Sequence, residues 1–232
     1  MPTTSTSVVR PLWWGFVPYI VVSIVHVAAR FAAHDALADP TKLLLMPALM
    51  LAVFWGWHRL GAPHARGLLL AGLLFSWLGD GAGTFFPLAP TLPLMLLFFG
   101  VAHLCYMRAF WQHLAVKKLS CWAFSFAAWW LVLVIVIGPR AGGLIIAVAM
   151  YGVVLGGTAA LSTRCHPLVM CGGLFFLASD TILSFRIFAL ELMPDWTSGM
   201  VMLTYTVGQG LIVAGALLTV RRRAALAQGL RT

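Results

Sequence analysis

Eight apolar stretches, each close to the length needed to cross a bilayer, follow one another along this chain. A helix rises about 1.5 Å per residue, so roughly 20 residues cross the ~30 Å hydrocarbon core of a membrane. We therefore predict an all-α membrane protein whose single polytopic domain, residues 1–232, has eight transmembrane helices. The predicted spans are Leu12–Ala29, Leu43–Trp57, Gly67–Phe86, Leu92–Trp111, Trp122–Ile137, Gly142–Leu161, Leu168–Leu190 and Ser198–Val220. Turn residues separate them at Asp39-Pro40, Gly61-Ala62-Pro63, Pro87 to Pro93, Gly138-Pro139, His166-Pro167 and Pro194.

The composition excludes an ordinary soluble domain. Hydrophobic residues make up 62% of the chain and charged residues 9%, whereas about a quarter of the residues of a soluble domain are charged. The net charge of +9 lies in the short gaps between apolar stretches, which favours anionic membrane lipid as partner over nucleic acid. Without a C-x-x-C pair or a His set at ligand spacing, we predict free thiols, no metal site and no cofactor. The cysteines are Cys105, Cys121, Cys165 and Cys171.

Basic residues divide unevenly between the two sides that eight spans define. Eleven lie on the side of the termini: Arg10, Arg59, Arg66, Arg108, Lys117, Lys118, Arg164, Arg221, Arg222, Arg223 and Arg231. Four lie on the other side: Arg30, Lys42, Arg140 and Arg186. The positive-inside rule then predicts a multi-pass protein of the cell inner membrane with both termini cytoplasmic. An N-terminal tail would occupy residues 1–11 and a basic C-terminal tail residues 221–232.

Two of the six acidic residues, Asp80 and Asp180, fall inside predicted spans. A carboxylate at mid-helix costs roughly 2.5–3.5 kcal/mol to insert, so both are expected to face a protein interior or a wet cavity. Asp80 follows Arg66 by 14 residues and Asp180 follows Pro167 by 13. Both carboxylates are therefore expected in one layer, about 20 Å from the cytoplasmic surface. The alternative is that each is a satisfied polar group that holds helices together.

The two Asp residues also share a sequence context. Gly72-Leu73-Leu74-Phe75 and Gly79-Asp80 align with Gly172-Gly173-Leu174-Phe175 and Ser179-Asp180 at an offset of one hundred residues. The small residue before each Asp would let another backbone approach closely. This pattern favours a parallel four-plus-four internal repeat in which the third and seventh helices meet.

Further polar residues fall at similar depth in other spans. Each has an ordinary structural explanation as a hydrogen bond between helices or a snorkelling lysine, but together they predict a polar pocket inside the bundle. They are Lys42, Ser76, His103, Tyr106, Tyr151, Ser179, Tyr205 and Gln209. His103 and Tyr106 share one helix face, as do Tyr205 and Gln209.

At these positions the sequence resembles the YhhN family of integral membrane proteins, whose characterised members are lysoplasmalogenases. The resemblance runs in order from residue 41 to residue 212. It rests on Thr41-Lys42, Met46-Pro47, Phe75-Ser76, Gly79-Asp80, Gly100, Ala102-His103, Tyr106, Gly173, Phe175, Ser179-Asp180, Leu183, Tyr205, Gln209 and Leu211-Ile212. Two departures, Leu43 in place of a frequent Pro and the small Gly81-Ala82-Gly83, concern the pocket and the substrate more than the fold.

The resemblance implies a hydrolase that cleaves the vinyl-ether bond of a lysoplasmalogen, a lysophospholipid. Such cleavage needs one carboxylic acid to protonate carbon and one carboxylate to activate water, as paired carboxylates do in glycosidases. We expect Asp180 as acid and Asp80 as water activator, with carboxyl groups in contact or about 5–9 Å apart. The polar residues named above would orient water or a carboxylate, and Lys42 would meet the lipid phosphate.

Three alternatives stay open at this point. In a transporter or lipid-handling protein the Asp pair would be a proton relay. A metal-dependent amidase would need three His at one site, for which only His103 and, less clearly, His26 are available. A hydrolase of the same fold could also act on another enol ether or lysolipid.

Overall fold

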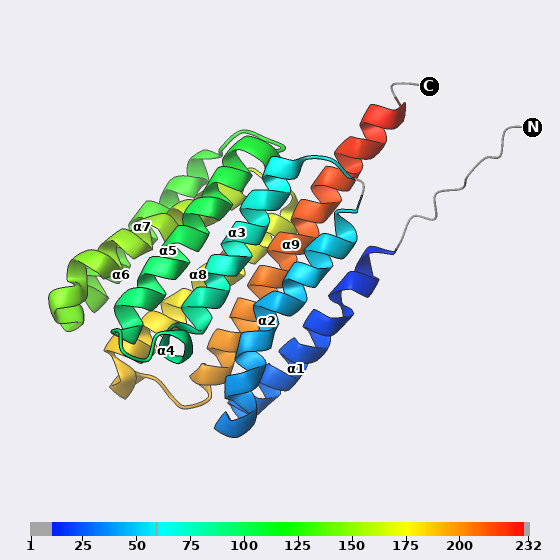
Figure 1. Cartoon of the computed structure of the whole chain (residues 1–232). Coiled ribbons are helices and arrows are strands. Elements are labelled where there is room, and N and C mark those ends of the chain that lie inside the picture. Colours follow the sequence, from blue (N-terminus) through cyan, green and yellow to red (C-terminus); the bar gives the residue numbers. More distant parts are fainter. Residues whose placement is uncertain (1–10, 59, 230–232) are drawn as a thin grey trace, which may run out of the picture.

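The computed structural model describes residues 11–58 and 60–229, and these ranges contain helices and connecting turns without a strand. Eight long helices run alternately up and down in one bundle (Figure 1). They are α1 (Val17–Phe31), α2 (Asp35–Gly56), α3 (Pro63–Asp80), α5 (Thr91–Ala109), α6 (Ser125–Ala141), α7 (Ile145–Ser162), α8 (Pro167–Phe188) and α9 (Thr197–Gly229). A short helix, α4 (Ala82–Phe85), follows α3. The all-α prediction is confirmed for this part of the chain.

Six segments of the described chain are long and apolar enough to cross a membrane: Leu12–Phe31, Asp35–Gly56, Thr91–Leu114, Cys121–Ser162, Pro167–Phe188 and Thr197–Gly229. The 42-residue segment Cys121–Ser162 contains two helices, α6 and α7. α3 is outside this set because it begins with Pro63, His64 and Arg66 and ends in Asp80. The chain is therefore built as a membrane protein, as predicted.

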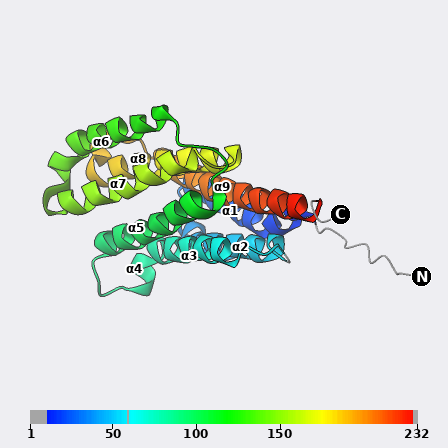
Figure 2. The same ribbon diagram turned by 90° about the horizontal axis from the view of Figure 1, so that it is seen from above.

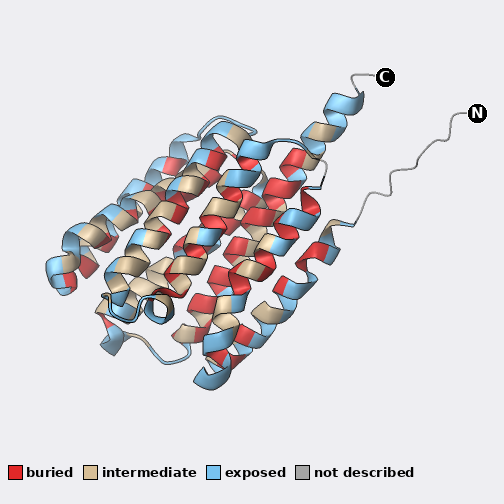
Figure 3. Ribbon diagram, in the orientation of Figure 1, coloured by how far each residue is buried: buried red, intermediate tan, exposed pale blue. Residues whose placement is uncertain are grey.

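The surface agrees with that conclusion. Buried residues lie on the inner faces of the helices, and α9 is the most extensively buried helix (Figure 3). Figure 2 shows α6, α7 and α8 on one side of the bundle and α2, α3 and α5 on the other. α9 packs on α8 and also on α1 and α2. The outer faces expose large apolar side chains such as Ile24 at 64% and Ile146 at 72%. Apolar surface on this scale requires lipid contact.

Glycines allow the backbones of α8 and α9 to touch. A Cβ atom on Gly172 would lie 2.7 Å from the carbonyl oxygen of Gly208, and one on Gly215 would lie 2.7 Å from the backbone nitrogen of Val169. Neither distance is sterically tolerable, so only glycine permits this approach. α8 packs mainly on α9, and α3 packs mainly on α5 and α2. The helices bearing Asp80 and Asp180 are thus linked mainly through neighbours, and the four-plus-four repeat stays a prediction.

The second span begins earlier than predicted, because Asp39-Pro40 does not break it. α2 starts at Asp35 and contains both Pro40 and Pro47. A proline removes the hydrogen bond to the carbonyl four residues before it, which for Pro47 is the carbonyl of Leu43. The Nε1–H of Trp77 on α3 donates to this carbonyl oxygen at 2.9 Å. An indole therefore replaces the missing backbone donor and lets the helix continue.

Two other predicted boundaries were wrong, and the helix of the eighth span extends beyond the predicted end of that span. The third span stops at Asp80 instead of Phe86, because Gly81 caps α3 and the chain turns into α4. Gly138-Pro139 does not end the fifth span, since α6 continues to Ala141 and the break falls at Gly142 with a φ of +52°. The eighth helix runs past Val220 to Gly229, so residues 221–229 of the predicted tail are helical.

The first and last described residues, Pro11 and Gly229, lie at the same end of the bundle (Figure 1). The starts of α3 and α8 lie at this end too, and the turns α1–α2, α6–α7 and α8–α9 lie at the opposite end. The described ranges do not include residues 1–10 of the predicted N-terminal tail or residues 230–232. Three of the basic residues counted above therefore lie outside them: Arg10, Arg59 and Arg231.

Candidate active site

Asp80 is the last residue of α3, not a mid-helix residue as predicted. Its side chain is only 4% exposed and lies 3.6 Å from the Nζ of Lys42 on α2, measured from Oδ1. The hydroxyl of Tyr205 on α9 donates to Oδ2 at 2.7 Å. A carboxylate at a helix C-terminus faces the negative end of the helix dipole, so the lysine and the hydroxyl offset an unfavourable position. Three helices thus converge on this carboxylate.

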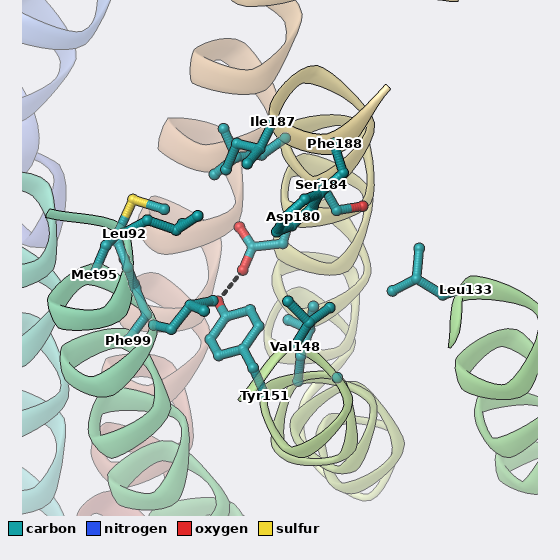
Figure 4. A pocket seen from close by; sticks show the side chains of 14 residues that line it. Leu92, Met95, Phe99, Leu133, Val148, Tyr151, Asp180, Ser184, Ile187 and Phe188 are labelled. Atoms are coloured by element: carbon teal, nitrogen blue, oxygen red, sulfur yellow. Dashed lines mark hydrogen bonds between the residues drawn. The ribbon is translucent and has the colours of Figure 1, made fainter. Parts of the chain in front are cut away.

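Asp180 lies within α8, and its side chain is 9% exposed. The hydroxyl of Tyr151 on α7 donates to Oδ2 (Figure 4). The Nε2 of His103 on α5 lies 3.9 Å from the same oxygen. The structure therefore brings three of the predicted site residues together here, from three different helices.

His103 is completely buried, and its contacts indicate which ring nitrogen carries the proton. Its Nδ1 lies 3.2 Å from Oγ1 of Thr158, whose own hydroxyl donates to the carbonyl of Val154 at 2.8 Å. Thr158 must then accept from Nδ1–H. In the neutral ring the Nε2 lone pair faces the hydroxyl of Tyr151 at 3.4 Å, beside Asp180. The imidazole is positioned to accept or return a proton at this carboxyl group.

Asp180 opens into a pocket of about 50 Å³ between α5, α6, α7 and α8. Figure 4 shows its carboxyl group surrounded by apolar side chains, with Tyr151 below it. The apolar lining residues are Leu92, Met95, Leu96, Phe99, Leu133, Val148, Leu155, Leu183, Ile187 and Phe188. Such a lining suits an apolar group, and the volume admits only a short piece of a hydrocarbon chain.

Ser76, Tyr106 and Gln209 form a separate buried chain of hydrogen bonds. The hydroxyl of Tyr106 donates to Oε1 of Gln209 at 2.8 Å, and Nε2 of Gln209 donates to Oγ of Ser76 at 3.1 Å. In the described part of the molecule, no hydrogen bond joins this chain to either carboxylate. These three residues connect α3, α5 and α9 beside the site.

The small residues before the two Asp residues serve different contacts from those expected. Gly79 makes room for the ring of Phe99, since a Cβ atom there would lie 2.7 Å from that ring. Ser179 donates to the carbonyl of Val201 at 2.9 Å and so fixes α8 to α9. The close contact at Gly79 is with a side chain, not with another backbone.

Two aromatic residues that sequence reasoning missed connect the surroundings of the two carboxylates. The ring of Phe176 lies 4.7 Å from that of His103 and 5.4 Å from that of Tyr205, between centroids. Phe99 contacts both Phe176 and Tyr205. Spacing gives a signal: Phe176 lies four residues before Asp180, and Phe99 four before His103, each pair on one helix face.

Among the described residues, no three His, Cys, Asp or Glu side chains gather in a way that could hold a metal ion. The four cysteines are free.

Comparison with known protein families gives a match over residues 37–216, most of the chain. The chain belongs to the YhhN family. The matched range includes every predicted site residue from Lys42 to Gln209. Searches of curated proteins and of solved structures found no match.

In this YhhN protein the chemistry that the site can perform depends on the different surroundings of its two carboxyl groups. One lies beside an ammonium group, and the other lies in an apolar pocket beside a phenol and an imidazole. Such a pair is suited to acid–base chemistry on an apolar substrate.

Proposed function

We propose that this protein is a membrane-embedded hydrolase that cleaves the vinyl-ether bond of lysoplasmalogens. Two observations support this function: membership of the YhhN family and a pair of buried carboxyl groups in different surroundings. The second observation carries the proposal, because vinyl-ether hydrolysis needs an acid and a base at neighbouring carbons.

The reaction begins with transfer of the Asp180 proton to the β carbon of the vinyl ether, which leaves an oxocarbenium ion at the α carbon. Asp80 takes a proton from water as the water oxygen bonds to the α carbon. The hemiacetal then breaks its bond to the glycerol oxygen, which takes the proton held by Asp80, while the hemiacetal hydroxyl gives up its proton toward Asp180, so both carboxyl groups return to their starting states. One water is consumed, and the products are a fatty aldehyde and a glycerophospho-head group. Positioned acids and bases of this kind contribute about 10²–10⁴-fold.

The surroundings of the two groups support this division of roles. The β carbon is the start of the hydrocarbon chain, and Asp180 lies in a small apolar pocket that suits such a carbon. Asp80 lies beside the ammonium group of Lys42 and accepts a hydrogen bond from Tyr205, so polar groups surround the carboxyl group that receives the proton of water. Nε2 of His103 would take the proton released by the hemiacetal hydroxyl and pass it to Asp180.

The decisive experiment is incubation of purified protein with a lysoplasmalogen and measurement of released aldehyde. A lysolipid with a saturated alkyl ether is the matched control, because it offers no carbon to protonate. Aldehyde from the vinyl ether alone is expected. Its absence, with folded protein in a lipid environment, would contradict the proposal.

Eight crossings with both termini cytoplasmic are part of the proposal. α3 is 18 residues long, which corresponds to roughly 27 Å, and it runs alongside α2 and α5 (Figure 1). Of the described basic residues, eight lie at the end of Pro11 and Gly229: Arg66, Arg108, Lys117, Lys118, Arg164, Arg221, Arg222 and Arg223. Four lie at the other end.

This charge distribution predicts the orientation in the inner membrane. Alkaline phosphatase fused after Gly229 is expected to be inactive, and the same enzyme inserted in the α6–α7 turn to be active. Activity of the C-terminal fusion would reverse the orientation or change the number of crossings.

A further inference from the structure

A second pocket, of about 210 Å³, lies between α1, α2, α8 and α9. It is located at the end of the bundle opposite Pro11 and Gly229, where α1 and α8 end and α9 begins (Figure 1). Unlike the pocket at Asp180, it is lined largely by polar groups. Those that matter here are His26, Arg30, Asp39, Lys42 and Arg186.

The lining contains three cationic side chains and one exposed carboxylate, Asp39. Arg30 is held by Asp35 at 3.0 Å and by Oγ of Ser198. Arg186 donates through Nη1 to Oγ1 of Thr197 at 2.6 Å, and within the described ranges it has no carboxylate partner. These contacts hold the guanidinium groups in place at the pocket, which is the arrangement that binds a phosphate.

His26 adds a hydrogen-bond acceptor to the same pocket. It is 1% exposed, and its Nδ1 lies 3.1 Å from the carbonyl oxygen of Ala38. A carbonyl only accepts, and the hydroxyl of Thr41, 3.0 Å from Nδ1, donates to the carbonyl of Leu37 at 2.6 Å, so the proton is on Nδ1 and Nε2 carries a lone pair. Among the described residues Nε2 has no hydrogen-bond partner. A buried acceptor without a donor is costly, and a ligand hydroxyl would satisfy it.

The polar pocket is joined to both carboxyl groups. Leu183 lines it and also lines the apolar pocket of Asp180. Lys42 lines it and also contacts Asp80. A ligand with a polar head and one hydrocarbon chain would therefore pass the two carboxyl groups where its head meets its chain.

We propose that this polar pocket binds the glycerophosphate head of a lysophospholipid, with the phosphate at Arg30, Lys42 and Arg186. The free hydroxyl of the glycerol donates to Nε2 of His26, so a lipid with a second chain at that position is rejected. This inference rests on the proposed function for its choice of ligand. His26 and Arg30 precede the range matched by the family, so this part of the head-group pocket lies outside the family match.

The test measures binding without catalysis. The probe is a lysophospholipid with a saturated alkyl ether, which cannot undergo vinyl-ether cleavage, titrated into the detergent-solubilised full chain. Arg186→Gln is expected to raise the Kd roughly 10–100-fold, the range for a hydrogen bond to a charged group. Arg140→Gln is the matched control, since Arg140 lies at the same end of the bundle but pairs with Glu191 away from the pocket. Equal Kd values for the two variants would overturn the phosphate site.

Arg186 also holds the α8–α9 turn, so Arg186→Lys is measured beside it. This variant keeps the charge, and it is expected to recover part of the affinity if the phosphate is the ligand. A thermal melt confirms that each variant is folded. Free glycerol 3-phosphate is titrated in parallel, and an affinity equal to that of the lysolipid would show that the ligand is a soluble phosphate ester.

His26→Asn tests the hydroxyl contact, because Asn keeps a donor near Ala38 but removes the ring Nε2. The variant is expected to bind the lysolipid about 2–10-fold more weakly and an analogue with a methylated hydroxyl no differently from the wild type. An equal loss for both lipids would overturn the role of His26. All of these measurements are independent of aldehyde release, so the binding site can fail while hydrolysis stands, or stand while hydrolysis fails.

Discussion

Asp80 and Asp180 are both buried aspartates of one helix bundle, yet the chemical groups around them differ. Asp80 ends a helix beside an ammonium group and next to a polar pocket. Asp180 lies inside a helix, in an apolar pocket with a phenol and an imidazole as its polar contacts. The comparison teaches that burial alone does not define a catalytic role; the charge and polarity of the neighbours do.

Replacement of either carboxylic acid should have the largest effect. Asp80→Asn and Asp180→Asn keep the shape of the side chain but cannot exchange a proton, so each is expected to lower turnover about 10²–10⁴-fold. Aldehyde release per folded molecule is the measurement. A folded Asn variant that keeps most of its turnover would remove that residue from the mechanism and break the comparison.

The two tyrosine hydroxyls provide a sharper test of charge. If Asp80 is ionised, Tyr205→Phe loses a hydrogen bond to a charged group and should lower the free energy of unfolding by roughly 1.5–3 kcal/mol. If Asp180 is protonated, Tyr151→Phe loses a neutral hydrogen bond and should cost only roughly 0.5–1.5 kcal/mol. Denaturation in detergent compares the pair, and the reverse order would exchange the roles of the carboxyl groups.

A packing variant separates a loss of fold stability from a loss of turnover. Gly215→Ala places a methyl group against the backbone of α8 and should destabilise the fold by roughly 1–3 kcal/mol. Gly215 is far along α9 from Tyr205, so turnover per folded molecule is expected to be unchanged. A lower turnover at wild-type stability would mean that the site senses the α8–α9 contact.

Chelation should have no effect at either carboxylate. The described residues offer no three-ligand cluster, and Asp80 already contacts Lys42 and Tyr205. Aldehyde release is therefore expected to persist in EDTA. Loss on chelation with recovery on added zinc would favour the metal-dependent alternative.

The sequence predicted the features that depend on the cost of placing charge in lipid. The apolar stretches and the turn residues between them predicted helices of alternating direction. Asp180 was found because a carboxylate inside an apolar stretch is costly unless it has a function or a partner. His103, Tyr151 and Tyr205 were found in the same way. Each is a polar group within a span, and each contacts a carboxylate in the structure.

Features that depend on tertiary contacts were not predictable in this way. The start of α2 was missed because Asp39-Pro40 has the sequence signature of a break, although the helix continues through it. The donor that compensates Pro47 comes from a tryptophan 30 residues later in the chain, which local sequence does not reveal. Tyr106, Gln209 and Ser76 have the same sequence signature as the site residues, but they hydrogen-bond to one another. Phe99 and Phe176 carry no polar signal at all, although they connect the two halves of the site.

The hydrogen bond from Trp77 to Leu43 has a consequence for the chemistry beside it. Leu43 follows Lys42 directly, and Trp77 precedes Asp80 by one turn of α3. The main chains of α2 and α3 are thus fastened together next to the ammonium–carboxylate pair by a contact that carries no net charge. The distance between Lys42 and Asp80 therefore does not depend on the attraction between their charges. Asp80 can gain and lose a proton through a catalytic cycle while the backbones of α2 and α3 stay in place.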